Sequence, residues 1–246
     1  SNLSLELKLH SYSWFKIGIR DIPKYYLREF HDRDLSNIDY YDCTFSSQSF
    51  FASYSLPVKW IRKTWIKVYT DYTKEYYNPH FTEFDLEKYM VKFDLNHRSR
   101  KKHKMKLSVA HGSAKNITYG SYLSSTTFDR SYIFDKLYSE FIYKNINNNI
   151  IEQLGISLLL EQRYYELESS HYSFDNWKFY LDGRAKLWVD WDFMDSIDIR
   201  SWYQYRWRDA NTRLNGDFDW VEDIKSHTKH ELWMEISLLT VFDYFY

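Results

Sequence analysis

The chain is poor in the residues that cross-link or interrupt a polypeptide: its 246 residues include one cysteine, three prolines and six glycines. The single cysteine, Cys43, excludes an intrachain disulfide and a cysteine-rich metal cluster. The prolines are scattered at positions 23, 57 and 79, and no stretch rich in Pro, Gly or Ser separates one part of the chain from another. We therefore expect a single domain over residues 1–246.

Long apolar runs and an excess of one charge are also missing. No run approaches the roughly 18–20 apolar residues that a transmembrane helix needs, and the mean hydropathy is −0.63. Lys and Arg number 33 against 34 for Asp and Glu, a net charge of −1. This balance gives no overall attraction to nucleic acid, so we expect no nucleic-acid partner. The 9 histidines show no zinc-binding spacing, and we expect no metal and no cofactor.

Aromatic residues, by contrast, are abundant: 24 Tyr, 17 Phe and 10 Trp make up 21% of the chain. A soluble hydrophobic core does not need so many. Outer-membrane β-barrels use Tyr and Trp in girdles at both membrane interfaces, and every second residue of their strands faces a polar lumen. The composition therefore favours such a barrel, although so few glycines are unusual for one.

The last stretch of the chain, Glu231 to Tyr246, alternates strictly between two kinds of side chain. Period-2 alternation predicts a β-strand with one apolar face, and this strand would be long beside the usual five or six residues. Its charges, Glu231, Glu235 and Asp243, share one face. The uncharged face would carry Leu232, Met234, Ile236, Leu238, Thr240, Phe242, Tyr244 and Tyr246.

Similar alternation recurs over residues 3–10, 50–60, 87–96, 105–109 and, most clearly, 176–208. Within the last of these, Asp182-Gly183 predicts a two-residue type I′ hairpin turn. We place that turn at a periplasmic end of the sheet, and we expect a second short turn at residues 194–195. Residues 132–145 have apolar positions at helical spacing, but we interpret them as a further strand.

One face of the region 176–208 is uncharged and the other carries both signs. A charged side chain facing lipid at mid-bilayer costs roughly 2–4 kcal/mol, so a membrane barrel requires such a charge-free face. At about 20 residues per strand and connection, the chain predicts an antiparallel transmembrane β-barrel of roughly 12 strands. The alternative is a soluble β-sandwich or jelly roll that binds carbohydrate through aromatics such as Trp177, Trp188, Trp191 and Trp202.

The charged face of the same region carries the candidate solute-contacting side chains. In a barrel lumen, a mixture of cations and aspartates forms either a selectivity wall for anionic solutes, such as acidic sugars, or internal ion pairs that fill and rigidify a narrow barrel. The candidates are Lys178, Arg184, Lys186, Asp190, Asp192, Asp198, Arg200, Arg206 and Arg208.

A basic run at residues 97–104 lies between two predicted strands. Such a loop binds phosphates of nucleic acid or of lipopolysaccharide, or is simply a solvated hairpin tip. No aromatic residue interrupts the run, which argues against single-stranded nucleic acid as its ligand.

His111 and Ser113 lie two residues apart on one face of a predicted strand, with Asn116 nearby. A His and a Ser so placed could form a nucleophile pair. The outer-membrane phospholipase family has a His, a Ser and an Asn of this kind on the outside of its barrel, and this resemblance would imply a barrel lipase. The fuller family motif is absent and Asn116 does not match the position of the family's Asn. We therefore interpret the segment as a polar turn and do not expect an enzyme.

The segment from Tyr203 to Asn211, followed by a loop and residues 227–238, is similar to the last hairpin of many Gram-negative outer-membrane barrels. These include porin-like proteins and the barrels that follow tetratricopeptide repeats in polysaccharide export systems. An Arg-Asp-Ser-Asn-like end precedes the loop in them, and Ala210 replaces that Ser here. The resemblance implies that Phe242, Tyr244 and Tyr246 form the insertion signal read by the barrel assembly machinery.

The same resemblance implies a location in the bacterial outer membrane, in contact with its lipid and lipopolysaccharide, and partner subunits of an envelope complex. The expected function is a porin-like channel or the outer-membrane component of an export or surface-assembly system.

Overall fold

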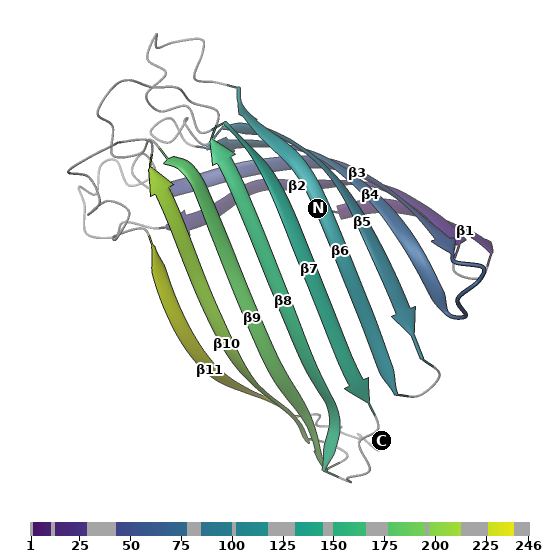
Figure 1. Cartoon of the computed structure of the whole chain (residues 1–246). Helices are drawn as coiled ribbons and strands as arrows, with labels where there is room; N and C mark the ends of the chain where they lie inside the picture. Colours follow the sequence, from purple (N-terminus) through teal and green to yellow (C-terminus); the bar gives the residue numbers. More distant parts are fainter. Residues whose placement is uncertain are drawn as a thin grey trace, which may run out of the picture.

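The computed structural model describes residues 2–10, 13–28, 43–77, 85–99, 102–117, 131–144, 150–165, 177–194, 197–212 and 226–238. Within these ranges the chain is all-β: eleven antiparallel strands form one sheet, each paired with its neighbours in sequence (Figure 1). The strands are β1 Asn2–His10, β2 Ser13–Arg28, β3 Cys43–Pro57, β4 Thr64–Tyr77, β5 Leu86–Arg98, β6 His103–Asn116, β7 Tyr132–Lys144, β8 Ile151–Tyr165, β9 Trp177–Met194, β10 Ile197–Thr212 and β11 His227–Leu238.

The strands are long and are joined as successive hairpins. Apart from β1, each has 12 to 18 residues. Short connections, such as residues 58–63 and 195–196, alternate along the chain with longer ones, such as 29–42 and 213–226. Since consecutive strands are antiparallel, all the short connections lie at one end of the sheet and all the longer ones at the other. No helix of the length and apolarity needed to cross a membrane occurs in the described residues.

The alternation in the sequence becomes two chemically distinct faces of the sheet. On the face that we name the apolar face, a row of directly opposed residues crosses all eleven strands without a charge. Its members are Leu7, Phe15, Tyr54, Val68, Phe93, Val109, Leu137, Leu160, Gly183, Trp207 and Thr228.

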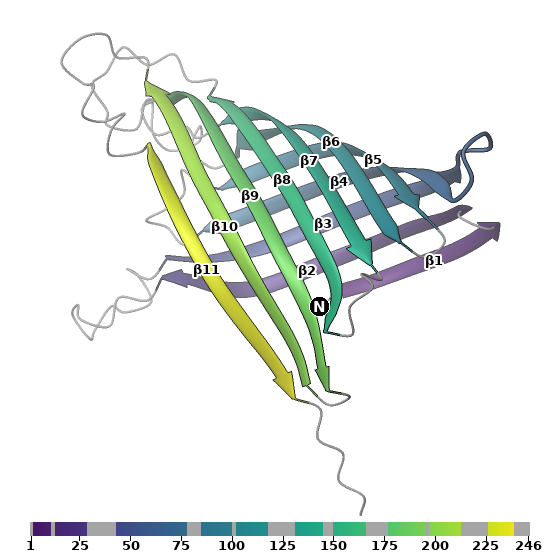
Figure 2. The same ribbon diagram turned by 60° about the horizontal axis from the view of Figure 1, so that its bottom comes forward.

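The adjacent row lies on the opposite face, which we name the polar face, and most of its members are charged. They are Glu6, Lys16, Ser53, Tyr69, Lys92, Ala110, Lys136, Glu161, Asp182, Arg208 and His227. The sheet is strongly curled (Figures 1 and 2). Ser55 and Asp94 of the polar face are buried, whereas Phe93 and Val109 of the apolar face are about half exposed. The polar face is therefore the inside of the curve.

The described glycines share one role, which is to leave room for an aromatic ring on the neighbouring strand. Gly18, Gly112, Gly155 and Gly183 are directly opposite Phe51, Phe134, Trp188 and Trp207, respectively. A Cβ atom on Gly155 or Gly183 would lie only 2.0 Å from the opposing indole. These four glycines thus serve close packing across strands rather than turns.

The hairpin turn predicted at Asp182-Gly183 is wrong, and so is the periplasmic end placed there. β9 continues through both residues, and Gly183 pairs with Leu160 on one side and Trp207 on the other. The dipeptide resembles a turn signal only because Trp207 excludes a side chain at position 183. The second expected turn is confirmed in place, since β9 ends at Met194 and β10 begins at Ile197.

The structure also confirms a strand at β7, where the apolar spacing imitates a helix. The two edges of the sheet are β1 and β11, which pair only with β2 and β10 within the described ranges. Because ten antiparallel pairings separate them, these edges run in the same direction. The part of the chain described is therefore an open, curled sheet of eleven strands.

Candidate functional site

The apolar face offers a continuous surface of exposed aliphatic and aromatic side chains. Leu7, Phe93 and Val109 of the uncharged row are 50%, 50% and 48% exposed, and Leu232 near the β11 edge is 82% exposed. All described strands belong to one sheet, so no second described layer covers this face. Its exposure must therefore be explained by an apolar environment or partner.

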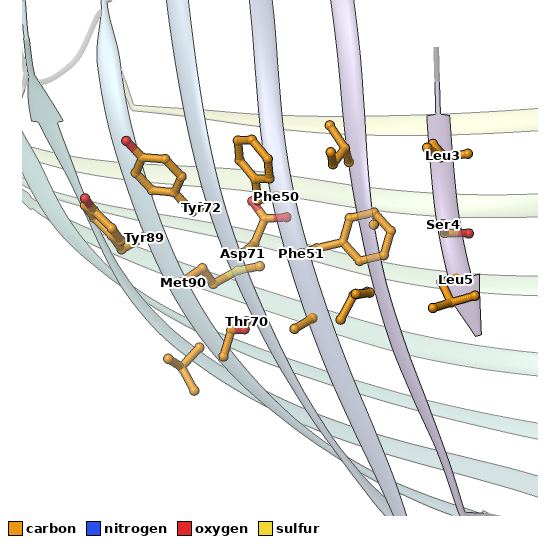
Figure 3. A pocket seen from close by; sticks show the side chains of 15 residues that line it. Leu3, Ser4, Leu5, Phe50, Phe51, Thr70, Asp71, Tyr72, Tyr89 and Met90 are labelled. Carbon is orange, nitrogen blue, oxygen red and sulfur yellow. The ribbon is translucent and has the colours of Figure 1, made fainter. Parts of the chain in front are cut away.

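A hollow of about 790 Å³ lies on this face over β1 to β5 (Figure 3). Phe50, Tyr72 and Tyr89 follow one another along one side of it, while Leu3 and Leu5 lie at the β1 end (Figure 3). The ring centroids of Phe50 and Tyr72 are 6.5 Å apart and those of Tyr72 and Tyr89 are 4.8 Å apart. The lining is almost entirely apolar, which suits a hydrocarbon chain and not a polar solute.

The polar face is held together by charge-assisted hydrogen bonds between neighbouring strands. Arg200 donates to both carboxylate oxygens of Asp190, at 2.5 and 2.7 Å, and Gln153 donates to the same carboxylate. Arg208 forms a similar fork on Asp182, with distances of 2.6 and 3.1 Å. Planar forks of this kind are stronger and more directional than single ion pairs.

A second charged cluster lies on β4, β5 and β6, and the sequence interpretation missed it. Asp94 is buried between Lys92 and Lys106, whose ammonium nitrogens are 3.9 and 3.6 Å from its Oδ2. Lys92 also lies over the ring of Tyr69, 4.9 Å from the centroid. The alternation around residues 88–96 and 104–109 was the available signal, but only strand register shows that these lysines converge on one carboxylate.

The structure brings most of the predicted solute-contacting residues together. Arg184, Lys186, Asp190, Asp198, Arg200, Arg206 and Arg208 all lie on the polar face of β9 and β10. Lys178 and Asp192 belong to β9, but their side chains lie outside the described part of the structure. The predicted insertion signal, Phe242, Tyr244 and Tyr246, also lies outside the described residues.

Two cations of this set, together with Lys229, which the sequence interpretation did not include, face one another across adjacent strands. Arg206 on β10 is directly opposite Arg184 on β9 and Lys229 on β11. Arg184 and Arg206 are both exposed. Two hollows, of about 380 and 190 Å³, are lined in part by Arg184, and the second is also lined by Arg206. The polar face therefore contains open space bordered by cations as well as closed ion pairs.

The tryptophans suggested as a sugar platform are divided between the faces. Trp188 and Trp202 are opposed to each other on the polar face, where Trp188 is buried. Trp191 lies on the apolar face and donates a hydrogen bond of 2.9 Å to the hydroxyl of Ser201. The side chain of Trp177 is not among those described. The three described rings therefore do not form one platform.

The basic run at 97–104 lies where β5 turns into β6, as a hairpin tip should. The backbone N–H of Ser99 donates to the carbonyl of His103 across this turn, at 2.9 Å. His97 is tied to β4, with its Nδ1 2.7 Å from the hydroxyl of Thr64. The run thus belongs to a short hairpin at the end of the sheet that carries the short connections.

The interpretation of the segment around His111 as a polar turn is wrong, because β6 continues through it to Asn116 and pairs on both sides. His111 and Ser113 lie on the apolar face of β6, but Asn116 lies on the polar face. The residue directly opposite His111 is Asp135 on β7, and His111 Nδ1 is 2.8 Å from its Oδ1. Gln162 on β8 donates to the other oxygen of Asp135 at 3.2 Å. The carboxylate partner of the histidine was missed because the neighbouring strand supplies it.

No protein-family model matches this sequence, and comparison with curated proteins returns no match. Among the described residues, no group of three or more His, Cys, Asp and Glu side chains could hold a metal ion. The function must therefore be argued from the two faces of the sheet.

Proposed function

We propose that this sheet forms the wall of an outer-membrane β-barrel, whose polar face lines a path for hydrophilic solutes. Its role would be that of a porin-like channel or of the outer-membrane component of an export or surface-assembly system. The observation that carries the proposal is the uncharged row across all eleven strands, backed on the opposite face by a row in which most residues are charged.

The main support for a membrane environment is the exposure of the apolar face. Soluble monomers rarely expose contiguous apolar patches beyond a few hundred Å². A β-sandwich hides such a face against a second sheet about 10 Å away, but all the described strands lie in one sheet. Hydrocarbon stabilises the face without a second protein layer, and the hollow near Phe50 and Tyr72 suits an acyl chain.

The support for a solute path is the character of the inside of the curve. Its ion pairs are fixed by neighbouring strands, as between Arg200 and Asp190. Hollows of about 380 and 260 Å³ remain among its charged side chains. A surface of fixed charges around open space is what a water-filled lumen presents to passing solutes.

The test is to refold the protein from urea into detergent and to compare boiled and unboiled samples on a denaturing gel. A membrane barrel is expected to migrate as a compact band when unboiled and to shift on boiling. Single-channel recording in planar bilayers then tests conduction. A protein that is monomeric and cooperatively folded in plain buffer, with no heat-dependent shift, would overturn the proposal.

A second candidate function, hydrolysis of a lipid ester, is favoured by the hydrogen bond between His111 and Asp135. The carboxylate binds Nδ1 and leaves Nε2 directed away from it, which is how an acid orients a general base beside a serine nucleophile. Ser113 follows two residues later on the same face of β6. Because this face is apolar, the substrate would be a membrane lipid.

The readout for this candidate is covalent labelling of Ser113 by a fluorophosphonate probe in lipid micelles, together with release of fatty acid. Ser113→Ala should abolish both signals and Asp135→Ala should reduce them strongly. Ser139→Ala, another serine on the apolar face, is the matched control. If Ser113→Ala releases fatty acid at the rate of the unmodified protein, the hydrolase candidate is rejected, and the barrel proposal is unaffected.

A further inference from the structure

Among the residues that the structure describes, the polar face contains one place where charges of the same sign are directly opposed on three adjacent strands. Arg184, Arg206 and Lys229 form this cationic row across β9, β10 and β11. Like charges directly opposite on a sheet are destabilising. Other opposed charges on this face are complementary, as in Glu6 with Lys16, Lys136 with Glu161, and Asp190 with Arg200, or are like-charged across two strands only, as in Glu161 with Asp182 and Arg98 with Lys104.

The nearby acids do not neutralise the two arginines of the row, because other groups already bind them. Asp182 accepts the fork from Arg208. Glu161 lies 2.6 Å from Arg163 Nε and 2.9 Å from Lys136 Nζ.

On β11, Glu231 lies 2.5 Å from Lys229 and accepts a hydrogen bond from Gln204. Within the described ranges neither Arg184 nor Arg206 forms an ion pair with an acid. The net charge left over at the row therefore belongs to these two guanidiniums.

Both arginines also border open space. A hollow of about 380 Å³ is lined by Arg184, Lys186 and Arg200 together with Glu140, among others, and a second of about 190 Å³ is lined by Arg184, Arg206 and Arg208 together with Glu161 and Asp182, among others. Arg184 is common to both, so both hollows border the cationic row. An incoming group would meet five cations here, and within the described ranges three of them (Lys186, Arg184 and Arg206) form no ion pair with an acid. The acids of the same hollows, Glu140, Glu161 and Asp182, have other partners in Tyr138, Arg163 and Arg208, respectively.

We propose that Arg184 and Arg206 bind the oxyanionic group, phosphate or carboxylate, of a solute that moves along the polar face. A guanidinium presents two parallel N–H donors that match the oxygens of either group. Two opposed arginines supply two such forks, and the anion replaces their mutual repulsion with attraction. This inference rests on the proposed function, because it takes the ligand to be a solute that moves along the polar face.

The first test is calorimetric titration of the refolded protein with inorganic phosphate and, separately, with glucuronate as the carboxylate source. Arg184→Gln and Arg206→Gln should each weaken binding about tenfold, and the double variant should remove it. Lys16→Gln, which removes one cation from the same face on β2, is the matched control and should leave binding unchanged. Binding that survives in the double variant would overturn the inference.

Stability measurements distinguish an anion site from a purely structural role, because the two predict opposite shifts in the midpoint of urea unfolding. Because Arg206 opposes two cations, Arg206→Gln should raise the midpoint of urea unfolding in the absence of anion, while weakening anion binding. Arg206→Glu should raise the midpoint further and abolish binding. A lower midpoint in Arg206→Gln would show that this arginine serves the fold, and would contradict the proposed site.

The two proposals fail in different ways. A protein that carries no current but binds phosphate, and loses binding in Arg206→Gln, retains the anion site and refutes the channel. A conducting protein whose phosphate affinity is the same in the double variant retains the channel and refutes the anion site.

Discussion

The indole of Trp207 on β10 occupies the space that a side chain on Gly183 of β9 would need, and the two residues are directly opposed. The same arrangement joins Gly155 and Trp188 on the other face of the sheet. Each tryptophan thus packs against bare backbone on its neighbour, which lets a large ring lie flat across two strands.

Gly183→Ala should therefore destabilise the folded protein by about 1–3 kcal/mol, since the added methyl group forces the indole or the backbone to shift. Urea unfolding monitored by tryptophan fluorescence measures the loss. In a Trp207→Leu background the same substitution should cost much less, because the ring that excludes the methyl group is gone. Equal costs in the two backgrounds would show that Trp207 is not the cause.

Arg200→Gln should lower the free energy of unfolding by about 2 kcal/mol, because it removes the guanidinium fork from the carboxylate of Asp190 and leaves the hydrogen bond from Gln153. The Asp190 side chain is only 11% exposed, so water replaces the lost fork poorly. The control is Lys16→Gln, whose partner Glu6 is 3.9 Å away and well exposed. That change should cost less than about 0.5 kcal/mol. If both variants unfold at the same urea concentration, the fork between Arg200 and Asp190 does not stabilise the protein more than the exposed pair does.

Leu107→Lys should destabilise the protein refolded into lipid vesicles by roughly 2–4 kcal/mol, because it places a charge on the apolar face. Gln204→Lys adds the same charge to the polar face, where it is opposite both Lys186 and Glu231, and should cost at most about 1 kcal/mol. Equilibrium urea titration in vesicles compares the two. A Leu107→Lys protein as stable as Gln204→Lys would mean that lipid does not contact this face.

The strands and their two faces could be predicted from the sequence because both are local properties. Alternation places Leu107 and Val109 on one side of β6 and Lys106 and Ser108 on the other, whatever β6 pairs with. Even β7 was interpreted correctly as a strand. Its helical spacing arises because Phe134 and Ile142 on the polar face are apolar too, so both faces contribute to the pattern.

The contacts between strands could not be predicted, because pairing and register depend on the whole sheet. The carboxylate beside His111, the lysines around Asp94 and the opposition of Arg184 to Arg206 all involve two or more strands. The Asp182-Gly183 error has the same origin. A glycine required by Trp207, far along the chain, has the local appearance of a turn.

The matching direction of β1 and β11 determines how this sheet can become a ring. Two strands that run the same way cannot pair antiparallel, and a closed ring of alternating strands always has an even number of members. If the ring closes with antiparallel pairings throughout, eleven strands need an odd complement, whose outer members run opposite to both edges, whether this polypeptide or another supplies it; the alternative is one parallel pairing of β1 with β11. Within the described ranges, the backbone edges along Asn2–His10 and His227–Leu238 therefore have their polarity already set for any strand that would join them.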